Sequence, residues 1–318
     1  MPLPFRRILV HVDATAAAQP ALDRAMELAG PAGATVKLVD VLPTPPAYAR
    51  LLMPPELRDL LRQRRTEDLE ALRASLATRG VTVTAELLEG RTAIALVRDV
   101  LRHDHDLLMR SHGVGRGAAR AHQFGPIDMQ LLRKCPCPVW LVQPRAGRLE
   151  RIVAAVDPIC ADPDHDELNG RILTIAGAVA GLERSELLVL HAWTPFGAEL
   201  LKSYMKGPEL RAYVAASQQT ARTAFDELVA RYPDALRGAE PHLVRGDAGW
   251  LIPRFARAKQ ADLVVMGTVA RTKISGFVIG NTAERALAGL RCSVLAIKPA
   301  GFICPVTLDE SGASPSDN

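Results

Sequence analysis

The stretch from Asp262 to Ala288 reads DLVVMGTVARTKISGFVIGNTAERALA and contains a strand, a glycine-bearing loop and a helix start. Leu263 to Met266 is an apolar run with two valines, typical of a strand buried on both faces of a parallel sheet. Gly280 ends the loop, and we expect Asn281 to cap a helix that begins there, with Glu284 completing a capping box. Amides at a helix start beside glycines can bind phosphate. The stretch therefore predicts either a phosphate site or an ordinary strand-to-helix connection.

The two halves of the chain repeat one another. The run from Arg7 to Asp13, RILVHVD, returns as RIVAAVD from Arg151 to Asp157, and each is an apolar strand that ends in aspartate. Further matches follow in the same order: Val36 to Val41 with Leu187 to Ala192, Glu89 to Arg91 with Arg245 to Asp247, Asp106 to Leu108 with Asp262 to Val264, and Cys135 to Val142 with Arg291 to Ile297. Helical patterns lie between these strands, so strand and helix alternate throughout.

The fold class that this alternation predicts is α/β. We expect two repeated, doubly wound domains, each an α/β/α sandwich around a five-stranded parallel sheet, with the ligand cleft at the carboxyl ends of the strands. A chain of 318 residues has the length of two such domains of about 150 residues each. The predicted bounds are residues 1–146 and 147–304, and the polar residues 305–318 are expected to form a disordered tail.

The loop of the opening stretch resembles the nucleotide loop of the universal stress protein family. That loop has the form Gly-x2-Gly-x9-Gly-Ser/Thr after the fourth strand, and this chain reads Gly267-x2-Ala270-x9-Gly280-Asn281-Thr282. Ala270 replaces the second glycine and Asn281 replaces the hydroxyl residue; the extra methyl group forbids little unless the backbone needs a positive φ. Because the alternation of strands and helices is also the architecture of this family, adenine-nucleotide alpha-hydrolase-like, the resemblance extends over nearly the whole chain, to the tandem two-domain type.

The resemblance implies a site for ATP, alone or with Mg²⁺, in the second half. The family contacts the nucleoside through residues that correspond to Asp157, the backbone of Ala192, and Met266. The phosphate loop would comprise Gly267, Ala270, Arg271, Gly280, Asn281 and Thr282. Arg271 can clamp phosphate oxygens or be a solvated loop residue. The stretch offers no convincing nucleophile or base, so we assign no catalytic residue.

The first half is expected not to hold ATP. Its corresponding helix start contains Pro126, which lacks an amide, and Asp128, which places a carboxylate in the first turn. That carboxylate would repel a phosphate. The alternative is that Arg110, His112 and Arg116 bind some other anion.

Composition excludes several other classes of protein. An aromatic content of 4% and a net charge of +4, with basic and acidic residues interspersed, argue against a nucleic-acid partner. No apolar run approaches the ~20 residues that span a bilayer, and the start of the chain lacks a signal-peptide pattern, so we expect no membrane partner and a cytoplasmic location. Cys135 and Cys137 lack a second paired cluster, and we assign no metal ligand.

These features predict a cytoplasmic tandem stress-response protein that binds ATP or a similar adenine nucleotide in its second domain, rather than a dedicated enzyme. The alternatives are a weak ATPase, which needs a positioned water and Mg²⁺, and an interaction module that holds an apolar small molecule. Domains of the family commonly pair along their last strands. We therefore expect Val139 to Val142 and Val294 to Ile297 to join the halves into a pseudo-dimer, and a homodimer of chains is left open.

Overall fold

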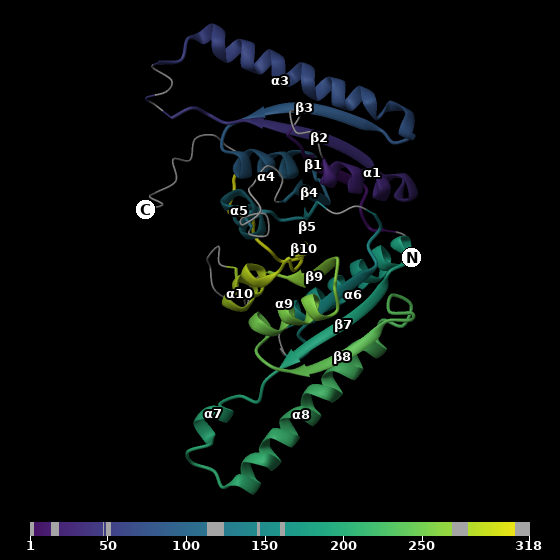
Figure 1. Ribbon diagram of the computed structural model, residues 1–318, viewed down its shortest axis with the longest axis vertical. Helices are drawn as coiled ribbons and strands as arrows, with labels where there is room; N and C mark the ends of the chain where they lie inside the picture. The colour runs from purple at the N-terminus through teal and green to yellow at the C-terminus, as the bar shows by residue number, and fades with distance from the viewer. Residues whose placement is uncertain are drawn as a thin grey trace. The chain divides into compact units, whose positions relative to one another are not determined.

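The computed structural model describes residues 3–13, 19–46, 48, 52–112, 124–144, 147–159, 163–268 and 279–308 (Figure 1). The chain forms two compact units. The first domain comprises residues from Leu3 to Ala146 together with the C-terminal segment from Phe302, and the second comprises Gly147–Gly301. Among the described residues, none of the helices combines the length and the apolar composition that a membrane span requires.

The first domain is built on a parallel sheet with the strand order β3-β2-β1-β4-β5. Its strands are β1 (Arg7–His11), β2 (Thr35–Leu42), β3 (Val83–Glu89), β4 (Leu107–Ser111) and β5 (Val139–Val142). The helices are α1 (Pro20–Ala32), α3 (Pro55–Ser75), α4 (Thr92–His103) and α5 (Pro126–Lys134), with a short 3₁₀ turn, η1 (Ala77–Arg79). Chain order and spatial order differ as a doubly wound fold requires.

The second domain repeats this arrangement with the strand order β10-β9-β6-β7-β8. Its strands are β6 (Arg151–Val156), β7 (Glu186–Trp193), β8 (Glu240–Arg245), β9 (Leu263–Gly267) and β10 (Ser293–Ile297). The helices are α6 (Pro163–Glu183), α7 (Ala198–Leu201), α8 (Gly207–Ala230), α9 (Ala248–Ala258) and α10 (Asn281–Gly289). The predicted α/β class, with a parallel five-stranded sheet in each half, is confirmed.

An aspartate that precedes the fourth strand ties each sheet together in the same way. The carboxylate of Asp106 accepts hydrogen bonds from the backbone amides of Arg6 and Arg7, at 2.7 and 3.0 Å. Asp262 accepts hydrogen bonds from the two amides at the start of β6, at 2.6 and 3.0 Å. The sequence repeat thus extends to individual hydrogen bonds, and it fixes β4 beside β1 and β9 beside β6 in equivalent registers.

The C-terminal segment differs from its predicted place. Residues 302–308 group with the first domain, so the second domain ends at Gly301 rather than at residue 304. Residues 305–308 of the predicted disordered tail are described: Val306 is 9% exposed, and the Nε of Arg98 donates a hydrogen bond to the carbonyl of Thr307 at 3.1 Å. A buried apolar side chain and one backbone carbonyl thus connect this segment to the first domain. The rest of the predicted tail, 309–318, lies outside the described residues.

Candidate functional site

The carboxyl ends of β6 and β7 place two of the expected nucleoside contacts side by side. The two strands pair up to Val156 and His191, so the residues that follow, Asp157 and Ala192, are neighbours at the same edge of the sheet. Asn169 of α6 holds the backbone of Asp157 from both sides: its Oδ1 accepts from the amide at 3.0 Å and its Nδ2 donates to the carbonyl at 2.9 Å. Asp157 is exposed. A fixed backbone therefore presents an accessible carboxylate.

His191 is a structural neighbour of this edge. Its ring is buried, with Nδ1 3.2 Å from the carbonyl of Val156. Burial lowers the pKa of His191, and this effect is larger than the opposing effect of the nearby charge of Asp157. The imidazole is therefore neutral at pH 7 and adds no charge to the site.

On the other side of β6, β9 ends with Met266 and Gly267. Met266 is 3% exposed. A Cβ on Gly267 would lie 2.8 Å from a methyl carbon of Leu168, so α6 packs closely against the strand at this glycine. The expected role of Gly267, in which the glycine lets a ligand approach the backbone, stays a prediction. Ala270 and Arg271 fall within 269–278, outside the described residues.

The start of α10 is tied back to the end of β9. The amide of Gly280 donates to the carbonyl of Thr268 at 3.3 Å, which closes the base of the loop. The helix begins at Asn281 as predicted, but the expected capping box is wrong: Gly280 is the N-cap, and no side-chain hydrogen bond caps this described turn. The reason is register, because the carbonyl of Gly280 accepts the amide of Glu284 at 2.9 Å and thereby opens the helix one residue earlier. Asn281 and Thr282 are exposed in the first turn.

The equivalent helix start in the first domain contains its own carboxylate. Asp128 of α5 is 1% exposed and accepts a hydrogen bond from the amide of Gly125 at 2.7 Å. The guanidinium of Arg110 pairs with it, and Nδ1 of His112 lies 3.2 Å from its second oxygen. Burial alone would raise the pKa of Asp128, but the hydrogen bond from His112 and the charge of Arg110 lower it overall. The anion position at this helix is thus filled from within the protein.

A second ion-pair group involves the aspartate that follows β1. Nη1 of Arg65, on α3, contacts Asp13 at 3.1 Å and Asp40 at 2.8 Å. Asp40 is 5% exposed within β2. Sequence reasoning missed this group, although a carboxylate inside the apolar run VKLVDVL is a signal that a cation must lie beside it.

Comparison with known proteins identifies the family of the chain. The sequence model of the Universal stress protein family matches twice, over residues 4–143 and 149–298. The chain belongs to this family. Universal stress protein E of Escherichia coli (strain K12) is 28% identical over 316 residues, which cover 96% of this chain and 98% of that protein. Universal stress protein E of Salmonella typhi is 29% identical, with the same coverage of both chains. The resemblance to the tandem two-domain type is confirmed.

Solved structures agree with the fold. The crystal structure of the functionally unknown protein PA1789 from Pseudomonas aeruginosa PAO1 has a TM-score of 0.67 at 28% identity, and the match covers 93% of this chain and 94% of that one. A universal stress protein from Archaeoglobus fulgidus DSM 4304 has a TM-score of 0.62 at 14% identity, over 93% of this chain and 99% of that one. The latter likeness shows the fold alone.

This universal stress protein also contains a cavity that sequence reasoning did not find. It has a volume of about 480 Å³ and lies between the end of β8 and α9. Its lining includes Val244, Arg245, Trp250, Leu251, Arg254 and Phe255. Val244 is in register with Ala192, so the cavity begins one strand away from the candidate nucleotide position.

Proposed function

We propose that this universal stress protein binds ATP or a similar adenine nucleotide in its second domain, at the carboxyl edge of β6, β7 and β9. The observation that carries the proposal is the start of α10. Its N-cap is a glycine with no side-chain cap, and the hydrogen bond from Gly280 to Thr268 places that turn at the end of β9. Backbone amides and the helix dipole both favour an anion at such a turn.

The nucleoside would lie across the strand ends. The exposed carboxylate of Asp157 can accept hydrogen bonds from ribose hydroxyls, and the backbone at Ala192 lies at the adjacent position. Met266 would pack on the base. The phosphates would then extend toward Gly280, Asn281 and Thr282, with Gly267, Ala270 and Arg271 completing the loop and Mg²⁺ bound through the phosphates.

Substitution of Gly280 tests the phosphate position. The backbone there has φ −58° and ψ 140°, which any residue adopts, and aspartate is a favourable N-cap. We therefore expect Gly280→Asp to fold normally but to lose at least about tenfold in ATP affinity, because its carboxylate meets the phosphates. Gly280→Asn has the same shape without the charge and should lose less. Calorimetric titration measures both, and equal ATP affinities for Gly280→Asp and the unmodified protein would contradict the proposal.

The cavity beside α9 favours a second candidate, an apolar small molecule held against Trp250, Leu251 and Phe255. Mass spectrometry of the ligand released from freshly purified protein separates the two candidates, because an adenine nucleotide and an apolar molecule differ in mass and in ultraviolet absorption. The titration of the Gly280 variants then tests whether the nucleotide binds at the start of α10.

We further propose that the protein acts in the cytoplasm as a nucleotide-binding stress protein and not as a dedicated enzyme. We assign no general base for water at this site, so hydrolysis should be slow at most. Pairing of the two domains along their last strands stays a prediction from the family.

A further inference from the structure

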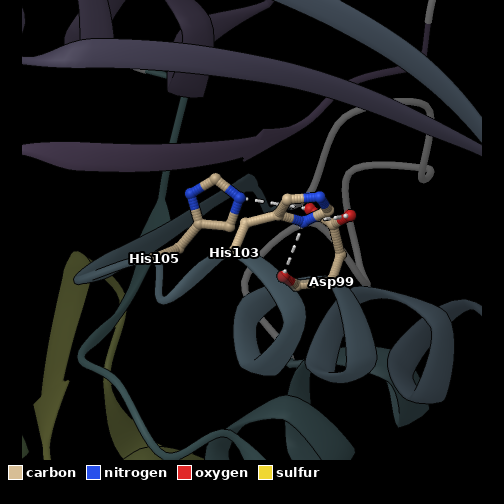
Figure 2. A group of neighbouring side chains, drawn as sticks. All are labelled: Asp99, His103 and His105. Atoms are coloured by element: carbon tan, nitrogen blue, oxygen red, sulfur yellow. Dashed lines mark hydrogen bonds and ion pairs between the residues drawn. The ribbon is translucent and has the colours of Figure 1, made fainter. Parts of the chain in front are cut away.

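Three side chains of metal-ligating type converge at the amino edge of the first sheet. Asp99 and His103 lie one turn apart near the end of α4, and His105 lies in the link that leads into β4. Figure 2 shows the three side chains directed toward one another. One ligand atom from each lies within 4.8 Å of the others. Because β4 begins just after His105, the cluster is at the opposite edge of the sheet from the carboxyl ends of the strands.

The spacings within the cluster are close to those of a coordination sphere. Nδ1 of His103 lies 3.2 Å from Oδ1 of Asp99, and Nε2 of His105 lies 3.2 Å from Oδ2. Bonds of about 2.0–2.1 Å to a tetrahedral zinc ion place neighbouring ligand atoms about 3.3 Å apart. The ring nitrogens of His103 and His105 form the third pair and lie within 4.8 Å of one another, so one ring would have to move for both to bind the ion.

Burial of the cluster is uneven in a way that suits an ion entering from solvent. The side chains of Asp99 and His105 are 2% and 7% exposed, whereas that of His103 is 49% exposed. Two ligands are therefore held in place by the protein, and the third can move to close the site. Such a combination of fixed ligands and an entry path is what a metal site requires.

Lys37 now supplies the positive charge that the buried carboxylate needs. Its ammonium lies 2.6 Å from Oδ1 of Asp99 and 2.7 Å from Glu86. A dication bound to Asp99 would displace the ammonium, and Lys37 would keep Glu86 as its partner. The ammonium of Lys37 thus competes with a metal ion for Asp99, and its displacement does not leave the lysine without a partner.

We propose that Asp99, His103 and His105 bind a divalent transition-metal ion, with zinc the best match and water as the fourth ligand. Two imidazoles and one carboxylate are ligands that zinc accepts, and magnesium and calcium prefer sites made of oxygen atoms alone. The ion would join the end of α4 to the start of β4. This proposal is independent of nucleotide binding.

The test is calorimetric titration of the metal-free, full-length protein with Zn²⁺ in the presence of a reductant. We expect His103→Ala to weaken zinc binding at this site at least about tenfold, since loss even of an outer partner costs that much. The half-exposed position of His103 makes the variant compatible with folding, which circular dichroism checks. His242→Ala is the matched control, because His242 also lies beside a carboxylate, at 3.6 Å from Glu240, but outside the cluster. It should bind zinc as the unmodified protein does.

Lys37→Met gives an independent arm. Removal of the competing ammonium should increase zinc affinity and make the thermal midpoint of the variant rise more on zinc addition than that of the unmodified protein. Cobalt absorption bands typical of four ligands would report the geometry directly. Zinc binding that is unchanged in both His103→Ala and Lys37→Met, or absent from the unmodified protein at about 0.1 mM Zn²⁺, would overturn the proposal.

Discussion

At the scale of single residues, Arg110 changes the chemistry of a strand end. It occupies in β4 the position that Met266 has in β9, because the two strands have equivalent registers with β1 and β6. A guanidinium in so enclosed a place requires a carboxylate, which Asp128 supplies. Removal of one partner from such a pair typically costs about 3–5 kcal/mol, because the other charge is left uncompensated. The stability of the first domain therefore depends on Arg110 and Asp128, whose positions correspond to the candidate ligand site of the second domain.

The histidine beside this pair should make the first domain sensitive to acid. Nε of Arg110 donates to Nδ1 of His11 at 3.2 Å. Burial and the charge of Arg110 lower the pKa of His11 to about 3, against the opposing effects of Asp13 and Asp128. Between pH 6.5 and 4 the unfolded chain takes up a proton at His11 and the folded chain does not. The free energy of unfolding therefore decreases as the pH is lowered, by up to about 1.4 kcal/mol per pH unit for this one group.

His11→Gln should flatten that dependence, because glutamine keeps an acceptor for Arg110 and does not titrate. Urea unfolding of both proteins at a series of pH values from 7 to 4 measures the difference, and the remaining histidines cancel in the comparison. Asp128 has a lowered pKa, so its own loss of stability begins only as the pH falls toward 3.8 and below. Equal slopes for His11→Gln and the unmodified protein would show that His11 takes up its proton at the same pH in the folded and the unfolded chain, and would contradict the lowered pKa.

At the scale of elements, the sequence was sufficient for the strands and the fold class but not for the details at the strand ends. The apolar runs, the repeat and the alternation with helices predicted the sheets because burial on both faces leaves a strong pattern. The capping of α10 was mispredicted because Gly280 and Asn281 are both good N-cap residues, and only the hydrogen bond from Glu284 to Gly280 distinguishes them.

The missed side-chain groups have a common physical reason. Asp99, His103 and His105 span the end of a helix, so their convergence depends on the path of the chain after His103. The pairing of Arg65 with Asp40 joins α3 to β2 across the packed interface. The pairing of Arg65 with Asp40 leaves no local spacing in the sequence. Asp99, His103 and His105 do form a local Asp-x3-His-x-His pattern, but the helix end after His103 decides whether the three side chains meet.

The C-terminal segment is an element whose contribution can be measured by truncation. Besides the burial of Val306, Sγ of Cys304 donates to the carbonyl of Lys134 at 3.2 Å. Removal of residues 302–318 should destabilise the first domain by about 1–3 kcal/mol, roughly the burial of one aliphatic side chain and a hydrogen bond. Calorimetry should show a fall of a few degrees in one transition. Truncation after Leu308 keeps every described contact and is the control; a similar fall in both would place the stabilising contacts elsewhere.

At the scale of the whole molecule, duplication gives two domains with the same sheet and different helix starts. In the second domain the first turn of α10 has no side-chain cap among the described residues, and in the first domain Asp128 occupies the corresponding turn of α5. Asp13 and Asp157 are both exposed, but Arg65 of α3 forms an ion pair with Asp13. Both differences act in the same direction, because each fills with protein charge a position that a nucleotide would need.

We therefore expect one ATP to bind per full-length chain. Gly280→Asp should bring the measured stoichiometry from one toward zero. Asp128→Asn removes a charge from the first domain and should destabilise that domain, because Arg110 is left uncompensated, but it should leave the stoichiometry at one, since Pro126 supplies no amide at that helix start. Isothermal titration with an independently measured protein concentration decides the matter. A stoichiometry of two, or a single site that persists in Gly280→Asp and is lost in Asp128→Asn, would mean that the first domain is the nucleotide-binding half and that its buried ion pair opens to admit the ligand.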